Sequence, residues 1–320
     1  MTCVPGLEAV LADEIYVKLG WPAIVQRGMV LATATDGDWK QLCCADNVYR
    51  VLGNGEVGPN KAYLSALAEW AVACVRTDGQ LLHMLQQPSL RVTASRKGKH
   101  SYSRFDAAMA VETGLVDALG WRHGDETRHD VALRLDIDHD KVMLSEKCSD
   151  AAFRFRGERQ FVSGALRPTL AHALVWLTHP DPRDMFVDPF CGSGTVALER
   201  AAYPSASITG IDLDDERLAI ARQNDRSNAV HWLQGDALQL PLEAESIDAV
   251  VTNPPWGMQL EAPQALCDRF LQSLQPHMKA GGRVILLQPF EPTQKGWTIC
   301  KLHTVSLHGT LVGVYSCVID

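Results

Sequence analysis

The stretch VDPFCGSGT, residues 187–195, decides the fold of the second half of the sequence. A short apolar run ends at Asp188, Gly192 and Gly194 follow in a tight turn, and Thr195 opens an apolar, helix-forming run. Glycine lets the backbone approach a ligand closely, and a strand–turn–helix arrangement points free N–H groups at that ligand. The stretch therefore predicts the first βα unit of a nucleotide-type binding site.

An acidic residue follows at the distance at which such a fold holds a ribose. Asp212 comes twenty positions after Gly192, at the end of the apolar run 208–211. A carboxylate at the end of the second strand accepts hydrogen bonds from ribose hydroxyls. No lysine follows the glycine turn to meet β- and γ-phosphates, so the pattern disfavours ATP or GTP.

The motif NPPWG, residues 253–257, ends another expected buried strand, residues 247–252. Proline fixes its own φ and favours an extended conformation in the preceding residue, so Asn253 is held at the strand end. The Asn253 side-chain oxygen and the Pro254 carbonyl can accept both hydrogens of an exocyclic amine, and Trp256 can stack on the base that carries it. For this motif alone, a plain turn after a strand is the alternative interpretation.

In this order, DPFCGSGT, GIDLDD and NPPWG resemble the S-adenosylmethionine-dependent methyltransferases that act on amines of RNA or DNA bases. The resemblance covers about residues 165–320. It implies a Rossmann-like class I methyltransferase domain, an α/β fold with a mostly parallel seven-stranded sheet and an antiparallel edge hairpin. It also implies that Asp236 accepts from the cofactor's adenine amine. The expected cofactor-binding residues are Asp188, Phe190, Gly192, Gly194, Thr195, Asp212, Asp236 and Asn253, and the expected catalytic residues are Asn253, Pro254 and Trp256.

The first half of the chain predicts α+β structure. A helix is expected over residues 5–19 and another over 38–51, and the glycine-rich stretch 51–60 suggests a domain boundary. The segment 95–105 gathers basic side chains with Tyr102 and Phe105 between them. Such a segment is typical either of a solvated loop or of a patch that follows phosphates and stacks bases.

This basic segment, with the strand before it and the helix and hairpin after it, resembles a THUMP domain. The module before it, with PGLE near the N-terminus, resembles the ferredoxin-like domain that precedes THUMP in several RNA methyltransferases. We therefore expect a ferredoxin-like domain at 1–55, a THUMP domain at 56–150, a linker at 151–164 and the methyltransferase domain at 165–320. The linker, rich in arginine, could equally lie along RNA. The resemblance implies RNA contacts from Arg96, Lys97, Lys99, His100, Arg104 and Arg167.

The composition of the chain limits which partners and cofactors are expected. The net charge of −8 argues against loose, charge-driven RNA binding, so any RNA contact requires a local basic patch. The nine cysteines include no C-x-x-C pair and no zinc spacing, which favours reduced thiols and no metal; Cys191 is interpreted as a filler of the glycine turn. The N-terminus is not a signal peptide, and no run reaches membrane-spanning length. We expect a cytoplasmic monomer without a membrane partner.

Together these features predict methylation of the N2 amine of a guanosine in tRNA, with guanosine 6 of the acceptor stem as the first candidate. Enzymes of this resemblance with asparagine at the first motif position include tRNA position 6 and 23S rRNA guanine-N2 methyltransferases, so the rRNA target stays open. An adenine-N6 target also stays open, because NPPW occurs in DNA adenine methyltransferases and residues 258–260 lack the basic run that often follows the motif. A catalytically silent RNA-binding protein is the alternative from another class.

Overall fold

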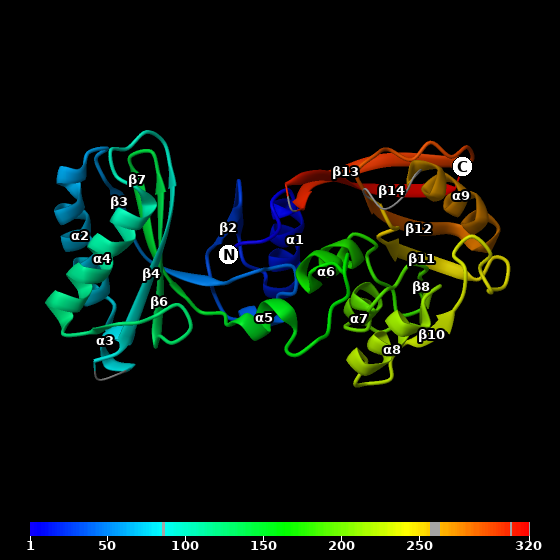
Figure 1. Cartoon of the computed structure of the whole chain (residues 1–320), viewed down its shortest axis with the longest axis horizontal. Helices are drawn as coiled ribbons and strands as arrows, with labels where there is room; N and C mark the ends of the chain where they lie inside the picture. The colour runs from blue at the N-terminus through cyan, green and yellow to red at the C-terminus, as the bar shows by residue number, and fades with distance from the viewer. Residues whose placement is uncertain (85–86, 257–262, 308, 320) are drawn as a thin grey trace. The chain divides into compact units, whose positions relative to one another are not determined.

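The computed structural model of the chain describes residues 1–84, 87–256, 263–307 and 309–319. It contains two compact units (Figure 1), of which unit 1 comprises residues 1–46 and 151–320 and unit 2 comprises residues 47–150. The division of residues 1–150 into a ferredoxin-like and a THUMP domain stays a prediction. Among the described residues, no helix has the length and apolar character needed to span a bilayer.

A seven-stranded sheet forms the centre of unit 1. Its order is β10-β9-β8-β11-β12-β14-β13; the neighbours from β10 to β12 pair in parallel, and β14 pairs antiparallel with β12 and with β13. This confirms the predicted mostly parallel sheet with an antiparallel edge hairpin. The strands are β8 (Met185–Asp188), β9 (Ser207–Asp212), β10 (His231–Gln234), β11 (Ile247–Thr252), β12 (Met278–Gln288), β13 (Trp297–Leu307) and β14 (Thr310–Ile319).

The strand order reverses between β8 and β11, because β9 lies on one side of β8 while the next strand in the direction of β12 is β11. In open parallel sheets, ligands bind at such a switch point, beyond the carboxyl ends of the strands. The helices of this part are α5 (Ala151–Phe155), α6 (Pro168–Trp176), α7 (Thr195–Arg200), α8 (Asp215–Asn224) and α9 (Pro263–Leu274), with the 3-10 turn η3 (Gln275–His277).

The N-terminal part of unit 1 contains α1 (Glu8–Leu19), the hairpin β1 (Ala23–Gln26) and β2 (Met29–Ala32), and η1 (Trp39–Gln41). The helix expected over residues 38–51 is wrong, since this range contains only the short 3-10 turn η1 and, from Tyr49, the start of the strand β3 (Tyr49–Glu56). The physical reason is a hydrogen-bond acceptor far away in the sequence. The carboxylate of Glu14, which is buried in α1, accepts the backbone N–H groups of Cys43 and Cys44, both at 2.8 Å. These two N–H groups are therefore not available for the hydrogen bonds of a helix.

Unit 2 is a five-stranded sheet with helices α2 and α4 packed on it (Figure 1). Buried residues alternate along β6, as the sequence predicts for the first strand of a hairpin, and β6 pairs antiparallel with β7. The sheet order is β3-β7-β6-β4-β5. The elements are β3 (Tyr49–Glu56), η2 (Lys61–Tyr63), α2 (Leu64–Thr77), α3 (Gly79–Met84), β4 (Ser89–Lys97), α4 (Arg104–Leu119), β5 (Arg122–His123), β6 (Val131–Asp138) and β7 (Lys141–Lys147).

Candidate active site

The glycine turn lies between β8 and α7, as the sequence predicts. Gly192 and Gly194 have φ values of +53° and +85°, in the left-handed region that favours glycine. A Cβ at Gly194 would lie 2.5 Å from the Trp232 ring, so no side chain fits there. A Cβ at Gly192 would lie 3.6 Å from Val162 Cγ2, an ordinary van der Waals contact, so Val162 borders the backbone at this glycine.

Asp212, at the end of β9, fastens this turn. One carboxylate oxygen accepts the Gly192 N–H at 2.8 Å and the other accepts the Asp214 N–H at 3.0 Å. A carboxylate has about four acceptor sites, so two remain for ribose hydroxyls. Asp236, which follows β10, accepts the Leu238 N–H at 2.9 Å and likewise retains acceptor sites. The ribose and adenine contacts themselves remain predictions.

Asp188, at the end of β8, is buried and supports the turn from within the core. Its Oδ1 atom accepts the Thr252 hydroxyl at 2.8 Å and the Phe190 N–H at 3.4 Å. Burial raises the pKa of Asp188 to about 7, an effect that the Thr252 hydrogen bond only partly opposes. The Phe190 ring packs edge-on against Phe270 at 5.2 Å. These interactions are all within the protein, so direct contacts of Asp188 and Phe190 with the cofactor stay predictions.

The amine-binding motif follows β11. Asn253 is held at both ends of its side-chain amide, because Nδ2 lies 3.5 Å from the Gly164 carbonyl and Oδ1 accepts the Trp256 indole N–H at 2.8 Å. Pro254 is buried, and Trp256 is half-buried. Sequence reasoning missed the contribution of Gly164, which carries no local signal for it. Gly257 and residues 258–260 lie outside the described residues.

The linker arginines are bound within unit 1. Arg159 pairs with Glu199 of α7 at 2.7 Å, and Arg156 pairs with the same carboxylate at 3.5 Å. Although burial raises the pKa of Glu199, the His172 hydrogen bond and these arginines bring that pKa to about 2. These two side chains therefore tie the linker to α7, and an RNA contact of the linker remains a prediction.

Arg167, an expected RNA contact, pairs with buried Asp46 at 3.1 Å. The Thr169 hydroxyl donates to the same carboxylate at 2.6 Å. Both residues thus attach the start of α6 to the N-terminal part of unit 1. A contact between Arg167 and RNA remains a prediction.

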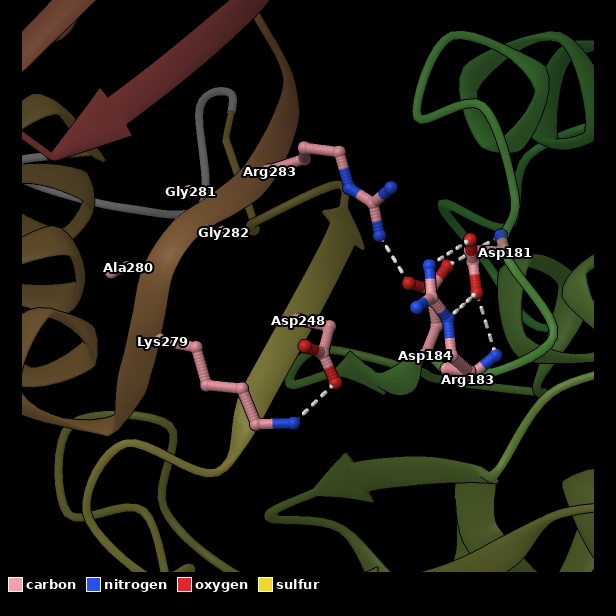
Figure 2. Close-up of a pocket in the computed structure, with 9 residues that line it drawn as sticks. All are labelled: Asp181, Arg183, Asp184, Asp248, Lys279, Ala280, Gly281, Gly282 and Arg283. Atoms are coloured by element: carbon pink, nitrogen blue, oxygen red, sulfur yellow. Dashed lines mark hydrogen bonds and ion pairs between the residues drawn. The ribbon is translucent and has the colours of Figure 1, made fainter.

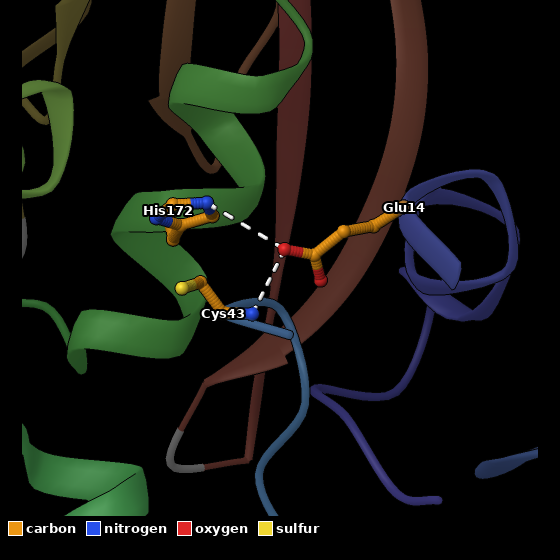
Figure 3. A group of neighbouring side chains, drawn as sticks. All are labelled: Glu14, Cys43 and His172. Atoms are coloured by element: carbon orange, nitrogen blue, oxygen red, sulfur yellow. Dashed lines mark hydrogen bonds and ion pairs between the residues drawn. The ribbon is translucent and has the colours of Figure 1, made fainter. Parts of the chain in front are cut away.

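Three ligand-type side chains, Glu14, Cys43 and His172, lie close together (Figure 3). Glu14 Oε1 already accepts the Cys43 N–H at 2.8 Å and the Lys18 ammonium at 2.7 Å. The two nitrogens of His172 lie 3.0 Å from Glu199 and 2.6 Å from the Tyr203 hydroxyl. Hydrogen bonds and the Lys18 charge account for this group, which joins α1 to α6 and α7.

A cavity of about 340 Å³ lies at the amino-terminal ends of β8, β11 and β12 (Figure 2). Its charges are paired, since Lys279 bonds Asp248 at 2.7 Å and Arg283 pairs with Asp184. The expected site residues follow the opposite, carboxyl ends of the strands. The cavity is therefore distinct from the candidate site.

In unit 2, the basic segment forms the end of β4 and the turn that follows. Lys97, Lys99 and Arg104 are exposed. Arg96 and His100 are half-buried, and Arg96 Nη1 lies 3.0 Å from His100 Nδ1. Tyr102 is buried in the core and donates its hydroxyl to the Gly58 carbonyl at 3.2 Å. The expectation that the Tyr102 ring stacks on bases is therefore wrong.

Phe105 is 69% exposed, with the Arg104 guanidinium 4.8 Å from its ring centroid. It therefore keeps its ring available for stacking on a base.

The strand order and the polar residues that follow β8, β9, β10 and β11 define a methyltransferase domain of the doubly wound type. Residues 156–295 match the UPF0020 family, described as an RMKL-like methyltransferase domain. S-adenosylmethionine is the cofactor predicted for this methyltransferase domain.

Known proteins support the same assignment. A tRNA (guanine(6)-N2)-methyltransferase of Thermus thermophilus is 32% identical over 210 residues, 62% of this chain and 62% of that protein. A tRNA (guanine(6)-N(2))-methyltransferase THUMP3 of Mus musculus is 28% identical over 59% of this chain and 41% of its own length. The crystal structure of TrmN from Thermus thermophilus superimposes with a TM-score of 0.85 at 27% identity, covering 100% of this chain and 98% of that one. In the two sequence comparisons, the chain spans less than two thirds of the length of the relative. The similarity to these proteins confirms the predicted resemblance.

Proposed function

We propose that the chain transfers the methyl group of S-adenosylmethionine to the N2 amine of a guanosine in tRNA, with guanosine 6 of the acceptor stem as the first candidate. The observation that carries this proposal is the position of Asn253, Pro254 and Trp256 at the end of β11, beside the β8 glycine turn at the switch point of the sheet. The similarity to tRNA (guanine(6)-N2)-methyltransferases supports the choice of base, atom and nucleotide.

The residues of the turn fit the cofactor. The Ser193 hydroxyl is buried there and has no hydrogen-bond partner among the described residues. Gly192 carries no side chain that would keep a ligand from the backbone of the turn, Asp212 retains acceptor sites for the ribose, and Asp236 retains them for the adenine amine. When bound, S-adenosylmethionine supplies an electrophilic methyl group on a sulfonium.

The target base must leave its stack to reach Asn253, which costs a few kcal/mol. Trp256 stacks on the base, while Asn253 Oδ1 and the Pro254 carbonyl accept the two hydrogens of the amine. These bonds direct the nitrogen lone pair toward the methyl group, so positioning supplies most of the acceleration. No strong base is required before transfer, because the nitrogen–carbon bond forms as the carbon–sulfur bond of the sulfonium breaks, and the cationic nitrogen is then acidic enough to lose its proton to solvent.

Unit 2 supplies the RNA grip in this proposal. Lys97, Lys99 and Arg104 are exposed and can follow phosphates, and Phe105 offers an exposed ring. We also propose a cytoplasmic monomer. All nine cysteines are free thiols, which agrees with a reducing compartment.

Methyl transfer from labelled cofactor to unmodified tRNA, rRNA and DNA, followed by nucleoside analysis, tests the proposal. N2-methylguanosine from tRNA is the expected product, and Asn253→Ala is the control variant, which should reduce turnover far more than it reduces cofactor affinity. N2-methylguanosine from rRNA alone or N6-methyladenine would establish one of the alternatives. Cofactor binding without any product would favour a silent or partner-dependent protein.

A further inference from the structure

Residues 159–164, here called the strap, run along the candidate site. Arg159 is anchored at one end by its 2.7 Å ion pair with Glu199. The Val162 side chain lies beside Gly192, and the Gly164 carbonyl lies 3.5 Å from Asn253 Nδ2. The strap therefore touches both the glycine turn and the amine-binding motif, although the sequence pattern assigned it to a linker.

One side chain holds the middle of the strap. Asn224, the last residue of α8, accepts the Gln160 N–H at 2.9 Å and donates to the Gln160 carbonyl at 2.8 Å. The same amide donates to the Ser193 carbonyl at 3.0 Å. Since an asparagine has two amide hydrogens, both are used. The Asn224 side chain thus fixes the strap and the glycine turn to a single point.

Two weaker contacts add to these bonds, because the Gln160 side chain donates to Gln223 at 3.4 Å and the Phe161 ring lies edge-on to Phe155 with 6.5 Å between the ring centroids. Gln160, Phe161, Ser163 and Gly164 are exposed, so burial of apolar surface contributes little to holding them. The position of the strap depends instead on a few polar bonds, of which Asn224 makes two. Displacement of the strap would uncover the Gly192 backbone and remove the acceptor that orients the Asn253 amide.

We propose that the strap is one wall of the cofactor site and that Asn224 is a positioning residue for methyl transfer. This inference rests on the proposed function, because the reaction gives the wall its purpose. Misplacement of reacting groups by about 1 Å can cost roughly a hundredfold in rate. Loss of the Asn224 amide therefore weakens both cofactor binding and turnover, without any contact between Asn224 and the reacting atoms.

Two strap variants form a matched pair that leaves α8 untouched. Both variants lose the 3.4 Å side-chain bond of Gln160 to Gln223, but Gln160→Pro also removes the N–H that donates to Asn224, whereas Gln160→Ala keeps both backbone bonds. A third variant, Asn224→Ala, removes the side-chain amide on α8 that makes these bonds. Calorimetric titration with S-adenosylmethionine, without RNA, should show about tenfold weaker binding for Gln160→Pro and Asn224→Ala, equivalent to about 1.4 kcal/mol. Gln160→Ala should bind within about twofold of the wild type.

Two further readouts separate positioning from folding. Hydrogen exchange of the strap amides should accelerate in Gln160→Pro and Asn224→Ala while the thermal unfolding midpoint stays near that of the wild type. Single-turnover methylation of tRNA should fall further than cofactor affinity does. Wild-type affinity and turnover in both variants would overturn the proposal, as would an equal loss in Gln160→Ala. A wild-type protein that binds the cofactor but forms no N2-methylguanosine would instead refute the proposed function and leave the affinity test of the strap intact.

Discussion

The Thr252 hydroxyl donates a 2.8 Å hydrogen bond to the Asp188 carboxylate, and this bond joins the last residues of β11 and β8. Both side chains are buried. The glycine turn follows directly after Asp188, and the amine-binding motif follows directly after Thr252. One hydrogen bond in the core therefore connects the segment proposed for the cofactor to the segment proposed for the target amine.

Removal of this donor should destabilise the protein. Thr252→Val preserves the shape of the side chain but leaves the buried Asp188 carboxyl without its hydroxyl partner. The expected loss is about 1–3 kcal/mol in the free energy of unfolding. Denaturant unfolding measures it, with Thr252→Ser, which retains the hydroxyl, as the control. If Thr252→Val and Thr252→Ser were equally stable, the bond would contribute nothing.

Asp188 should also make stability depend on pH. Burial raises its pKa to about 7 in the folded protein, from about 3.8 when unfolded. Between these values the folded state holds a proton that the unfolded state releases. Stability is therefore highest below about pH 4 with respect to this group and decreases as the pH rises toward 7, by up to about 1.4 kcal/mol per unit.

Asp188→Asn is the variant that isolates this effect, because an amide keeps an acceptor for Thr252 and does not titrate. The difference in unfolding free energy between wild type and Asp188→Asn, measured at several pH values, should decline from pH 4 to 7 and then level. A difference that is constant across this range would show that Asp188 has an ordinary pKa.

Trp256 has two separable properties, its indole N–H and its ring face. Trp256→Phe removes the 2.8 Å bond to Asn253 Oδ1 but keeps a ring, whereas Trp256→Ala removes both. Stacking is worth about 1–3 kcal/mol per base. We expect turnover on tRNA to fall about tenfold or more for Trp256→Ala and by a smaller factor for Trp256→Phe. Steady-state kinetics would refute base stacking if the two variants had the same turnover.

The sequence predicted those parts of the site that depend on local pattern. The glycine turn, Asp212 and NPPWG each follow an apolar strand, and the sheet brings them to neighbouring strand ends without further information. The strap was missed because its partners, Glu199 and Asn224, lie 40 and 64 positions away along the chain.

Contacts between distant residues also explain the glycines of the stretch 51–60. This stretch suggested a boundary, which stays a prediction, and residues Tyr49–Glu56 form β3. A Cβ at Gly55 would lie 2.7 Å from the Trp70 indole nitrogen, and one at Gly53 would lie 2.4 Å from Cys74 Sγ. These glycines make room for α2 rather than for a turn, and the sequence does not show which helix packs on them.

Exposed lysines in the basic segment should govern RNA affinity without affecting chemistry. The double variant Lys97→Ala/Lys99→Ala removes two exposed charges from the end of β4 and its turn. If both contact phosphates, binding of tRNA should weaken at every salt concentration, and the slope of log affinity against log salt should become shallower by about 1–2. Filter binding or fluorescence anisotropy measures this slope, and single-turnover rates at saturating tRNA should remain at the wild-type level.

Arg128→Ala removes an exposed charge elsewhere in unit 2 and serves as the control. If this variant weakened binding as much as the double variant, the effect would reflect the overall charge of unit 2 and the basic segment would have no special role.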